Sequence, residues 1–205
     1  RELKKHKFSK IFDLQNSTRT NFYKNILFPK VNKEIWSSSI TTLPNILDKK
    51  EFDKHSVLDR FNHQLQSSGL KTYYTLNPDF SWACSDISKI KNYFKLNKFI
   101  LLFPFCSPHL NIKKWPYYND LIKLILDKFG NEYKIVIAPG PSEIKDANKI
   151  NALVLLDNGK ALSIPQLSSL IKESSFIIAN DTGPAHIAAH VGAKGLTLFG
   201  KHTTA

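Results

Sequence analysis

The sequence has few cysteines and no long apolar run, and both shortages narrow the class of protein. Two cysteines, Cys84 and Cys106, occur among 205 residues, and they lie 22 positions apart. This spacing excludes a disulfide scaffold and a multi-cysteine metal site, and it is typical of a reducing compartment. The longest apolar runs, such as 99–105, are far shorter than the roughly 20 residues that a membrane-spanning helix needs. The sequence therefore predicts no transmembrane segment.

Methionine is absent, and residue 1 is Arg. We therefore expect the chain to be a fragment or a processed piece of a longer protein. The basic N-terminal stretch leads into the polar residues 13–16 and not into an apolar segment, which is not the pattern of a signal peptide.

Acidic residues are scarce: 17 Asp and Glu face 29 Lys and Arg, which gives a net charge of +12. Residues 1–98 carry +9 of this charge, so the first half is the candidate for meeting an anionic partner. A solvated Lys-rich surface, an acidic membrane and an acidic lipid substrate are the open alternatives. Nucleic acid is unsupported, because only three of the basic residues are Arg, the residue that base edges and phosphate forks favour.

In the second half, short apolar segments alternate with segments of helical spacing. The expected strands are 98–103, 133–138, 153–156, 176–179 and 196–199. The expected helices are 116–129, 142–150, 163–171 and 182–191. Strands that are almost continuously apolar, and that alternate with helices, indicate a parallel sheet covered by helices on both faces.

The first half is less regular. We expect a strand at 10–14, helices at 20–27, 55–66 and 87–94, and a linker at 95–98. The predicted domains are therefore 1–97 and 98–205. Two polar stretches in this half, 13–19 after the strand and 59–64 on a helix, are either parts of a site or an ordinary loop and a solvated helix face.

The sharpest local motif is Asn180-Asp181-Thr182-Gly183-Pro184-Ala185-His186, which follows an apolar strand and opens a helix. Open α/β sheets bind ligands at the carboxyl ends of their strands. Asp181 or Thr182 can cap the helix, and Gly183 allows a ligand to approach the backbone. Free N–H groups and the helix dipole make such a start a candidate anion site. The alternative is a well-capped helix with a partly buried His186.

A second motif, 104–116, follows the first strand of this half. Ser107 offers a hydroxyl group to a phosphate, and Lys113 or Lys114 offers a positive charge. Cys106 is interpreted as a small buried residue, because no His or Asp pattern around it indicates a nucleophile. No Walker A loop, G-x-G-x-x-G motif or metal-ligand spacing occurs in the sequence.

These motifs, in this order, resemble glycosyltransferase family 9, the ADP-heptose:lipopolysaccharide heptosyltransferases and their relatives. The resemblance rests on Phe12-Asp13-Leu14-Gln15 with Ser17-Thr18-Arg19, on Cys106-Ser107-Pro108 leading to Lys113-Lys114-Trp115-Pro116, and on the stretch from Asn180 to Ala189. It implies the GT-B architecture, an α/β fold of two Rossmann-like domains facing a cleft. Here the N-terminal domain is expected to be incomplete, and both ends of the chain to be missing.

The resemblance also implies roles for individual residues. Asp181, Thr182, Gly183 and His186 would border the diphosphate of a nucleotide sugar, and Ser107 and Lys113 would contact the same phosphates, with Lys114 as the fallback for Lys113. The family shows Gly where Phe105 stands, which makes the phosphate loop bulkier here. The family's general base is an Asp that we expect upstream of Arg1, so no catalytic residue is assigned and the fragment alone is expected to be inactive.

The resemblance implies an enzyme that inverts the anomeric centre and uses no metal and no cofactor. It would transfer heptose from an ADP-sugar to the lipopolysaccharide inner core, with an acidic lipid A-core acceptor as partner. Its location would be cytoplasmic, or peripheral at the inner face of the inner membrane. The alternatives are a relative that uses another nucleotide sugar, a non-catalytic nucleotide- or anion-binding module, and a basic nucleic-acid-binding protein.

Overall fold

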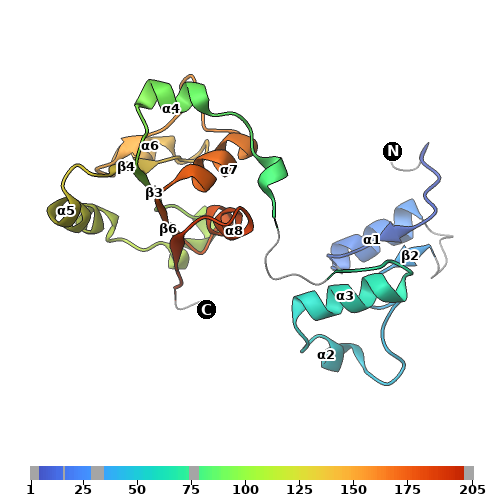
Figure 1. Ribbon diagram of the computed structural model, residues 1–205. Coiled ribbons are helices and arrows are strands. Elements are labelled where there is room, and N and C mark those ends of the chain that lie inside the picture. The colour runs from blue at the N-terminus through green and yellow to red at the C-terminus, as the bar shows by residue number, and fades with distance from the viewer. Residues whose placement is uncertain (1–4, 16, 29–34, 74–78, 201–205) are drawn as a thin grey trace. The chain divides into compact units, whose positions relative to one another are not determined.

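A computed structural model describes residues 5–15, 17–28, 35–73 and 79–200, and the chain divides into two units, 1–75 and 76–205 (Figure 1). The sequence analysis set the boundary between residues 97 and 98. In the structure, Ile87, Ile90 and Leu96 belong to the hydrophobic core of the second unit, with exposed fractions of 3%, 7% and 2%. The boundary in the structure therefore lies earlier in the chain than the predicted one.

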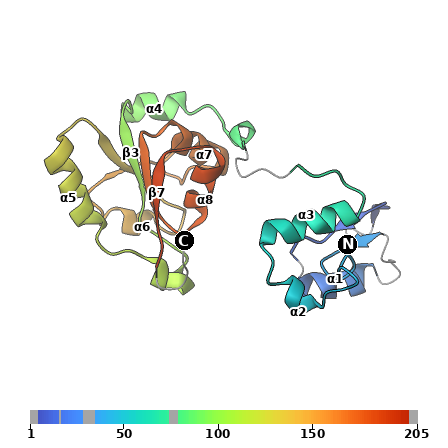
Figure 2. The ribbon, with the colours of Figure 1, turned by 60° about the horizontal axis from the view of Figure 1, so that its bottom comes forward.

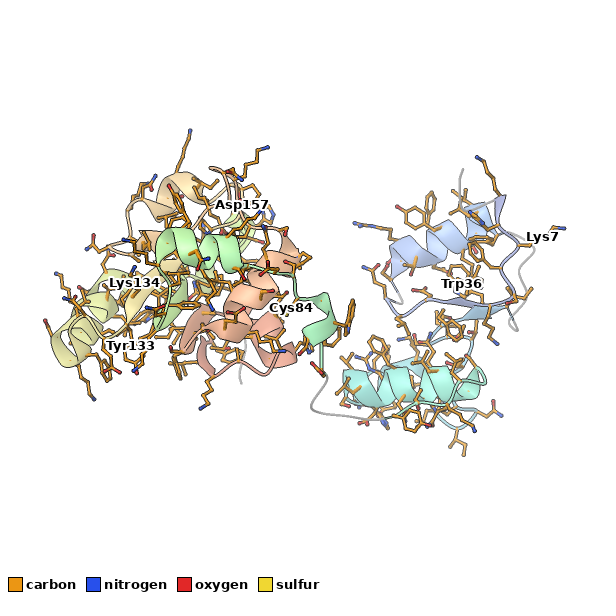
Figure 3. The ribbon with its side chains drawn as sticks, turned by 45° about the horizontal axis from the view of Figure 1, so that its top comes forward. Lys7, Trp36, Cys84, Tyr133, Lys134 and Asp157 are labelled. Atoms are coloured by element: carbon orange, nitrogen blue, oxygen red, sulfur yellow. The ribbon has the colours of Figure 1, made fainter. Side chains whose placement is uncertain are left out.

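The first unit pairs two short parallel strands and packs helices beside them. Its elements are β1 (Ile11–Phe12), α1 (Thr18–Leu27), β2 (Trp36–Ser37), α2 (Lys49–Phe52) and α3 (Val57–Ser67). Ser17 begins α1 through a reciprocal capping box with Thr20. Trp36, labelled in Figure 3, is only 6% exposed and anchors the small core of this unit.

The second unit contains all five strands that the sequence predicts. Its elements are the 3₁₀ helix η2 (Ser81–Ala83), α4 (Ser88–Phe94), β3 (Phe99–Phe103), the 3₁₀ helix η3 (Pro108–Lys113), α5 (Tyr118–Phe129), β4 (Lys134–Ile137), α6 (Ile144–Ala147), β5 (Leu153–Val154), α7 (Ile164–Glu173), β6 (Phe176–Asn180), α8 (Gly183–His190) and β7 (Gly195–Leu198). Helix α6 is shorter than the predicted 142–150.

The five strands form one parallel sheet in the order β5-β4-β3-β6-β7. Numbered by their place in the chain, these strands have the order 3-2-1-4-5 of a doubly wound fold, in which the chain moves outward from the first strand in one direction and then in the other. The reversal falls between β3 and β6, where Leu101 is opposite Ile177. The predicted α/β class with parallel strands is confirmed, and the loops after β3 and β6 meet at the switch point.

Successive residues of β3 serve opposite faces of the sheet. Leu101 and Phe103 pack with residues of α4, α7 and α8, whereas Ile100 and Leu102 pack with residues of α5. Figure 2 shows α5 on one side of the strands and α7 and α8 on the other. Both faces are therefore covered, which explains why the central strand β3 is apolar at every position. Each fully buried Leu, Ile or Phe stabilises this arrangement by about 1.5–3 kcal/mol.

The helices in the described part of the chain are short. None of them combines the length and the apolar composition that crossing a membrane requires.

Candidate functional site

A cavity of about 510 Å³ lies in the second unit, where the loops after β3, β4 and β6 meet. All six residues that the sequence analysis singled out contribute to its wall: Ser107, Lys113, Asp181, Thr182, Gly183 and His186. They come together because neighbouring parallel strands end at the same edge of the sheet. The volume is within the range of about 300–1,000 Å³ that is usual for small-molecule sites.

The loop after β3 forms one side of the cavity. Ser107 precedes the 3₁₀ helix η3, and its carbonyl oxygen accepts a hydrogen bond of 2.8 Å from the Leu110 N–H. Pro108 occupies the first turn, where its missing N–H costs nothing. The turn leaves Ser107 exposed at the rim and brings the chain back toward β6 at Lys113.

The loop after β6 forms the facing side, and helix α8 begins there. Thr182 occupies the N-cap position, but its hydroxyl group donates to the Asn180 carbonyl oxygen at 3.2 Å and makes no capping bond. The carboxylate of Asp181 accepts a hydrogen bond from Lys113. Neither of the two expected capping residues therefore caps α8, and the start of the helix borders the cavity at Gly183 without a side-chain cap.

Lys113 and Asp181 form an ion pair across the site. The ammonium Nζ of Lys113 donates to Oδ2 of Asp181 at 2.7 Å and to its backbone carbonyl oxygen at 3.1 Å. The exposed fractions of the two side chains are 20% and 14%, so water screens the pair only partly. The pair joins the loop after β3 to the loop after β6, 68 residues later in the chain.

His186 and Lys114 lie at the margins of this pair. The Nε2 atom of His186 is 3.9 Å from Oδ1 of Asp181, and the imidazole is 71% exposed. Lys114 Nζ instead lies 5.8 Å from the ring centroid of Phe105, as a cation–π contact. Lys113 contributes to the cavity wall, whereas Lys114 packs against the aromatic ring that stands where the family shows Gly.

The sequence analysis gave no individual role to three further residues around the site. Glu143 lies in the wall, and its Oε2 accepts a hydrogen bond of 2.8 Å from the Gly140 N–H, which holds the turn after β4. Asn180 and Tyr118 are buried directly beneath the loops, and their side chains are bonded to each other at 3.2 Å. A polar residue at the end of an otherwise apolar strand is the signal that could have indicated Asn180.

Cys106 also contributes to the cavity wall, and its Sγ lies 3.3 Å from the Leu110 carbonyl oxygen as a hydrogen-bond donor. Burial raises the pKa of this thiol. A raised pKa favours the neutral thiol over the thiolate, which is the nucleophilic form. Cys106 is half-buried and not fully buried as the sequence analysis expected, and its raised pKa does not favour the role of a nucleophile.

The polar residues of the stretch 59–64 on α3 form hydrogen bonds with different partners. Arg60 donates to Asp53 at 3.0 Å, and the His63 ring nitrogen lies 2.8 Å from the Thr42 carbonyl oxygen. Gln64 is fully buried, and its Nε2 donates to the carbonyl oxygens of Asp13 and Ser37, at 3.1 Å each. Gln64 therefore bridges the ends of β1 and β2, and this stretch does not form one site.

The residues that the structure describes contain no group of three or more His, Cys, Asp or Glu side chains that could hold a metal ion.

Comparison with known proteins gives a family and a fold. The model of glycosyltransferase family 9 (heptosyltransferase) matches residues 1–205. No curated protein sequence matches the chain.

Several solved structures are similar to the chain, and three of them are the following. Escherichia coli heptosyltransferase WaaC with ADP-2-deoxy-2-fluoro heptose has a TM-score of 0.66 and 15% identity, over 100% of this chain and 65% of that one. The structure of the same enzyme with ADP has a TM-score of 0.62 and 15% identity, over 96% of this chain and 63% of that one. A family 9 glycosyltransferase from Veillonella parvula has a TM-score of 0.52 and 20% identity, over 70% of this chain and 43% of that one.

The chain thus spans less than two thirds of the length of these relatives, as expected of a fragment. At these identities the similarity is one of fold, and the fold is that of GT-B glycosyltransferases. The match of the family model over the whole sequence goes further: the chain belongs to glycosyltransferase family 9, the heptosyltransferases.

Proposed function

We propose that the chain is part of an enzyme that transfers heptose from an ADP-sugar to the lipopolysaccharide inner core, with inversion and without a metal ion. The observation that carries this proposal is the cavity at the switch point, which gathers a lysine, a serine hydroxyl group and the start of a helix. Membership of family 9 supports sugar transfer. The choice of ADP draws on the similar WaaC structures, which contain ADP and an ADP-heptose analogue.

The chemistry of the wall suits a diphosphate. The start of α8 carries a partial positive charge, and Gly183 lets phosphate oxygens approach its backbone N–H groups. Ser107, exposed on the facing loop, can donate its hydroxyl hydrogen to the same group. These donors face one another across the cavity, so one diphosphate can contact both loops at once.

Lys113 supplies the full positive charge, and Asp181 holds it. A lysine ammonium has three hydrogens to donate. Two are directed to Asp181, at 2.7 and 3.1 Å, which leaves the third for a phosphate oxygen. A carboxylate repels a phosphate, so we assign Asp181 the role of positioning Lys113 and not that of a phosphate ligand.

The same groups would assist the chemical step. Cleavage of the bond between the sugar and the diphosphate leaves an additional negative charge on the departing ADP. Fixed donors placed where this charge develops stabilise the transition state more than the ground state. Lys113 and the start of α8 are the groups proposed for this role.

The first unit is the proposed site of the acceptor. Residues 1–75 contain 14 Lys and Arg and 7 Asp and Glu, a net charge of +7. A phosphorylated lipid A-core acceptor is acidic, so this charge favours its approach. The proposed location is the cytoplasm, or the inner face of the inner membrane, where such an acceptor is presented.

Calorimetric titration of the chain with ADP, UDP, GDP and CMP tests the donor assignment. We expect selective binding of ADP, with ribose phosphate as the weakly binding control. Lys113→Ala should lower the affinity, whereas Lys123→Ala, which removes the same charge from the exposed face of α5, should not.

Each other outcome changes the proposal in a defined way. Preference for UDP, GDP or CMP keeps the glycosyltransferase and discards ADP-heptose. Equal binding of all four nucleotides favours a non-catalytic anion-binding module. Lack of ADP binding by a folded chain, or equal affinities of Lys113→Ala and Lys123→Ala, contradicts the placement of the donor in this cavity.

A further inference from the structure

Asn180 is the last residue of β6 and is completely buried beneath the cavity wall. Its Oδ1 accepts hydrogen bonds from the Trp115 N–H at 3.4 Å and from the Tyr118 hydroxyl group at 3.2 Å. Its Nδ2 has no partner among the described residues. Burying an amide N–H without a partner is unfavourable, so fold stability alone does not explain an asparagine here.

Tyr118 extends the network to the neighbouring strand. Its hydroxyl oxygen is also 3.1 Å from the Phe103 carbonyl oxygen at the end of β3, and one hydroxyl hydrogen serves both acceptors. The side chain is 1% exposed, and burial raises the pKa of the phenol, which therefore stays a donor. The ends of β3 and β6, which carry the two loops of the site, are joined through this one hydroxyl group.

The loop that carries Lys113 is thereby held at two adjacent points. Asp181 binds the ammonium group of Lys113, and the preceding residue, Asn180, binds the backbone of Trp115. Trp115 lies two residues after Lys113, so fixing its backbone limits how far the lysine can move. The peptide segment 113–115 is clamped onto the end of β6 by two consecutive side chains, those of Asn180 and Asp181.

We propose that Asn180 is a positioning residue for diphosphate binding, which acts by fixing the segment 113–115 so that Lys113 is held in place before the ligand arrives. This inference rests on the proposed function for its ligand, a nucleoside diphosphate. A preordered donor loses less conformational freedom on binding than a mobile one. Asn180 thus raises affinity for the phosphates without touching them.

The clamp can be tested first without any ligand, by hydrogen exchange on the chain. In Asn180→Ala we expect the Trp115 amide to lose its protection while the amides in the middle of α5 keep theirs. Asn119→Ala is the matched control. Asn119 is next to Tyr118 on α5, and its side chain bonds to the backbone of Lys149 and Asn151, which do not line the cavity. Unchanged exchange at Trp115 in Asn180→Ala overturns the proposal.

The second test compares the binding of ADP with that of adenosine. We expect Asn180→Ala to weaken ADP about tenfold, the effect of one hydrogen bond, and to leave adenosine unchanged. In a Lys113→Ala background the same substitution should have little further effect, because the two residues act through one group. Equal losses for ADP and adenosine, or an undiminished effect in the Lys113→Ala background, overturn the proposal.

A milder variant covers the case in which Asn180→Ala does not fold. Tyr118→Phe keeps the buried ring and removes only the hydroxyl group, and it should reduce ADP binding and leave adenosine binding intact. Wild-type ADP affinity in this variant counts against the clamp. Failure of the wild-type chain to bind ADP contradicts the proposed function instead, and the exchange experiment still decides whether Asn180 fixes the loop.

Discussion

The ion pair between Lys113 and Asp181 gives the sharpest prediction. Lys113→Ala removes two hydrogen bonds, of 2.7 and 3.1 Å, and leaves a carboxylate that is only 14% exposed without its cation. The loss of a hydrogen bond to a charged group costs about 1.5–3 kcal/mol. Because both side chains are less than one quarter exposed, we expect the free energy of unfolding of the second unit to fall by this amount, measured by urea denaturation.

The affinity for ADP should depend on both Lys113 and Asp181. Lys113→Ala should weaken ADP by about 10- to 150-fold, the equivalent of one charged hydrogen bond. The remaining carboxylate then faces the diphosphate and repels it. Lys113→Ala combined with Asp181→Ala should therefore bind ADP more tightly than Lys113→Ala alone, although more weakly than the wild type.

Calorimetry with ADP, on samples whose folding is checked by circular dichroism, compares the three proteins. If the double variant binds no better than Lys113→Ala, the carboxylate does not oppose the ligand and Asp181 has been given the wrong role. If Lys113→Ala binds ADP as tightly as the wild type, the cavity is not the diphosphate site.

Three further predictions concern other parts of the molecule. Because burial raises the pKa of Cys106, its alkylation by iodoacetamide should be slow at neutral pH and accelerate as the pH rises above the ordinary thiol pKa; rapid labelling at pH 7, seen by peptide mass spectrometry, would refute this. Gln64→Leu removes the hydrogen bonds that the amide donates to the Asp13 and Ser37 carbonyl oxygens, the second of which keeps its bond from the Asp13 N–H, and should lower the unfolding free energy of the first unit by about 1–3 kcal/mol in urea; an unchanged midpoint would contradict the bridge. In Gly195→Ala the new Cβ would meet the Ile177 carbonyl oxygen at 2.7 Å, so we expect a loss of about 1–3 kcal/mol and a lower melting temperature.

The order of the elements in the second unit could be predicted because its strands are largely apolar. A strand such as Phe99–Phe103 is buried on both faces, so the sequence itself carries the signal of a covered parallel sheet. The convergence of Ser107 and Asp181 on one site was implied by the resemblance to family 9, and the sheet explains it, because both residues come directly after strands that end at one edge. Periodicity and position predicted the order of the elements.

The pairing of side chains could not be predicted in this way. Thr182 and Asp181 have the residue types of a helix cap, but a lysine 68 positions away binds the carboxylate and a backbone carbonyl accepts from the hydroxyl group. Which partner a side chain bonds to depends on distances that only the folded chain fixes. The role of Asn180 was equally inaccessible, because its partner Trp115 is 65 residues distant.

The position of the cavity at the switch point has a consequence for how the molecule folds. β3 and β6 are neighbours in space, but two other strands and three α-helices lie between them in the chain. Closing so long a loop is slow and costs entropy before the pairing repays it. The cavity thus forms only when β6 has joined the sheet, and no intermediate that lacks this strand contains both loops. A nucleotide that binds there would stabilise the completed sheet and none of its precursors. Ligand binding would then serve as a late checkpoint of folding, one that distinguishes a finished second unit from a compact but unfinished one.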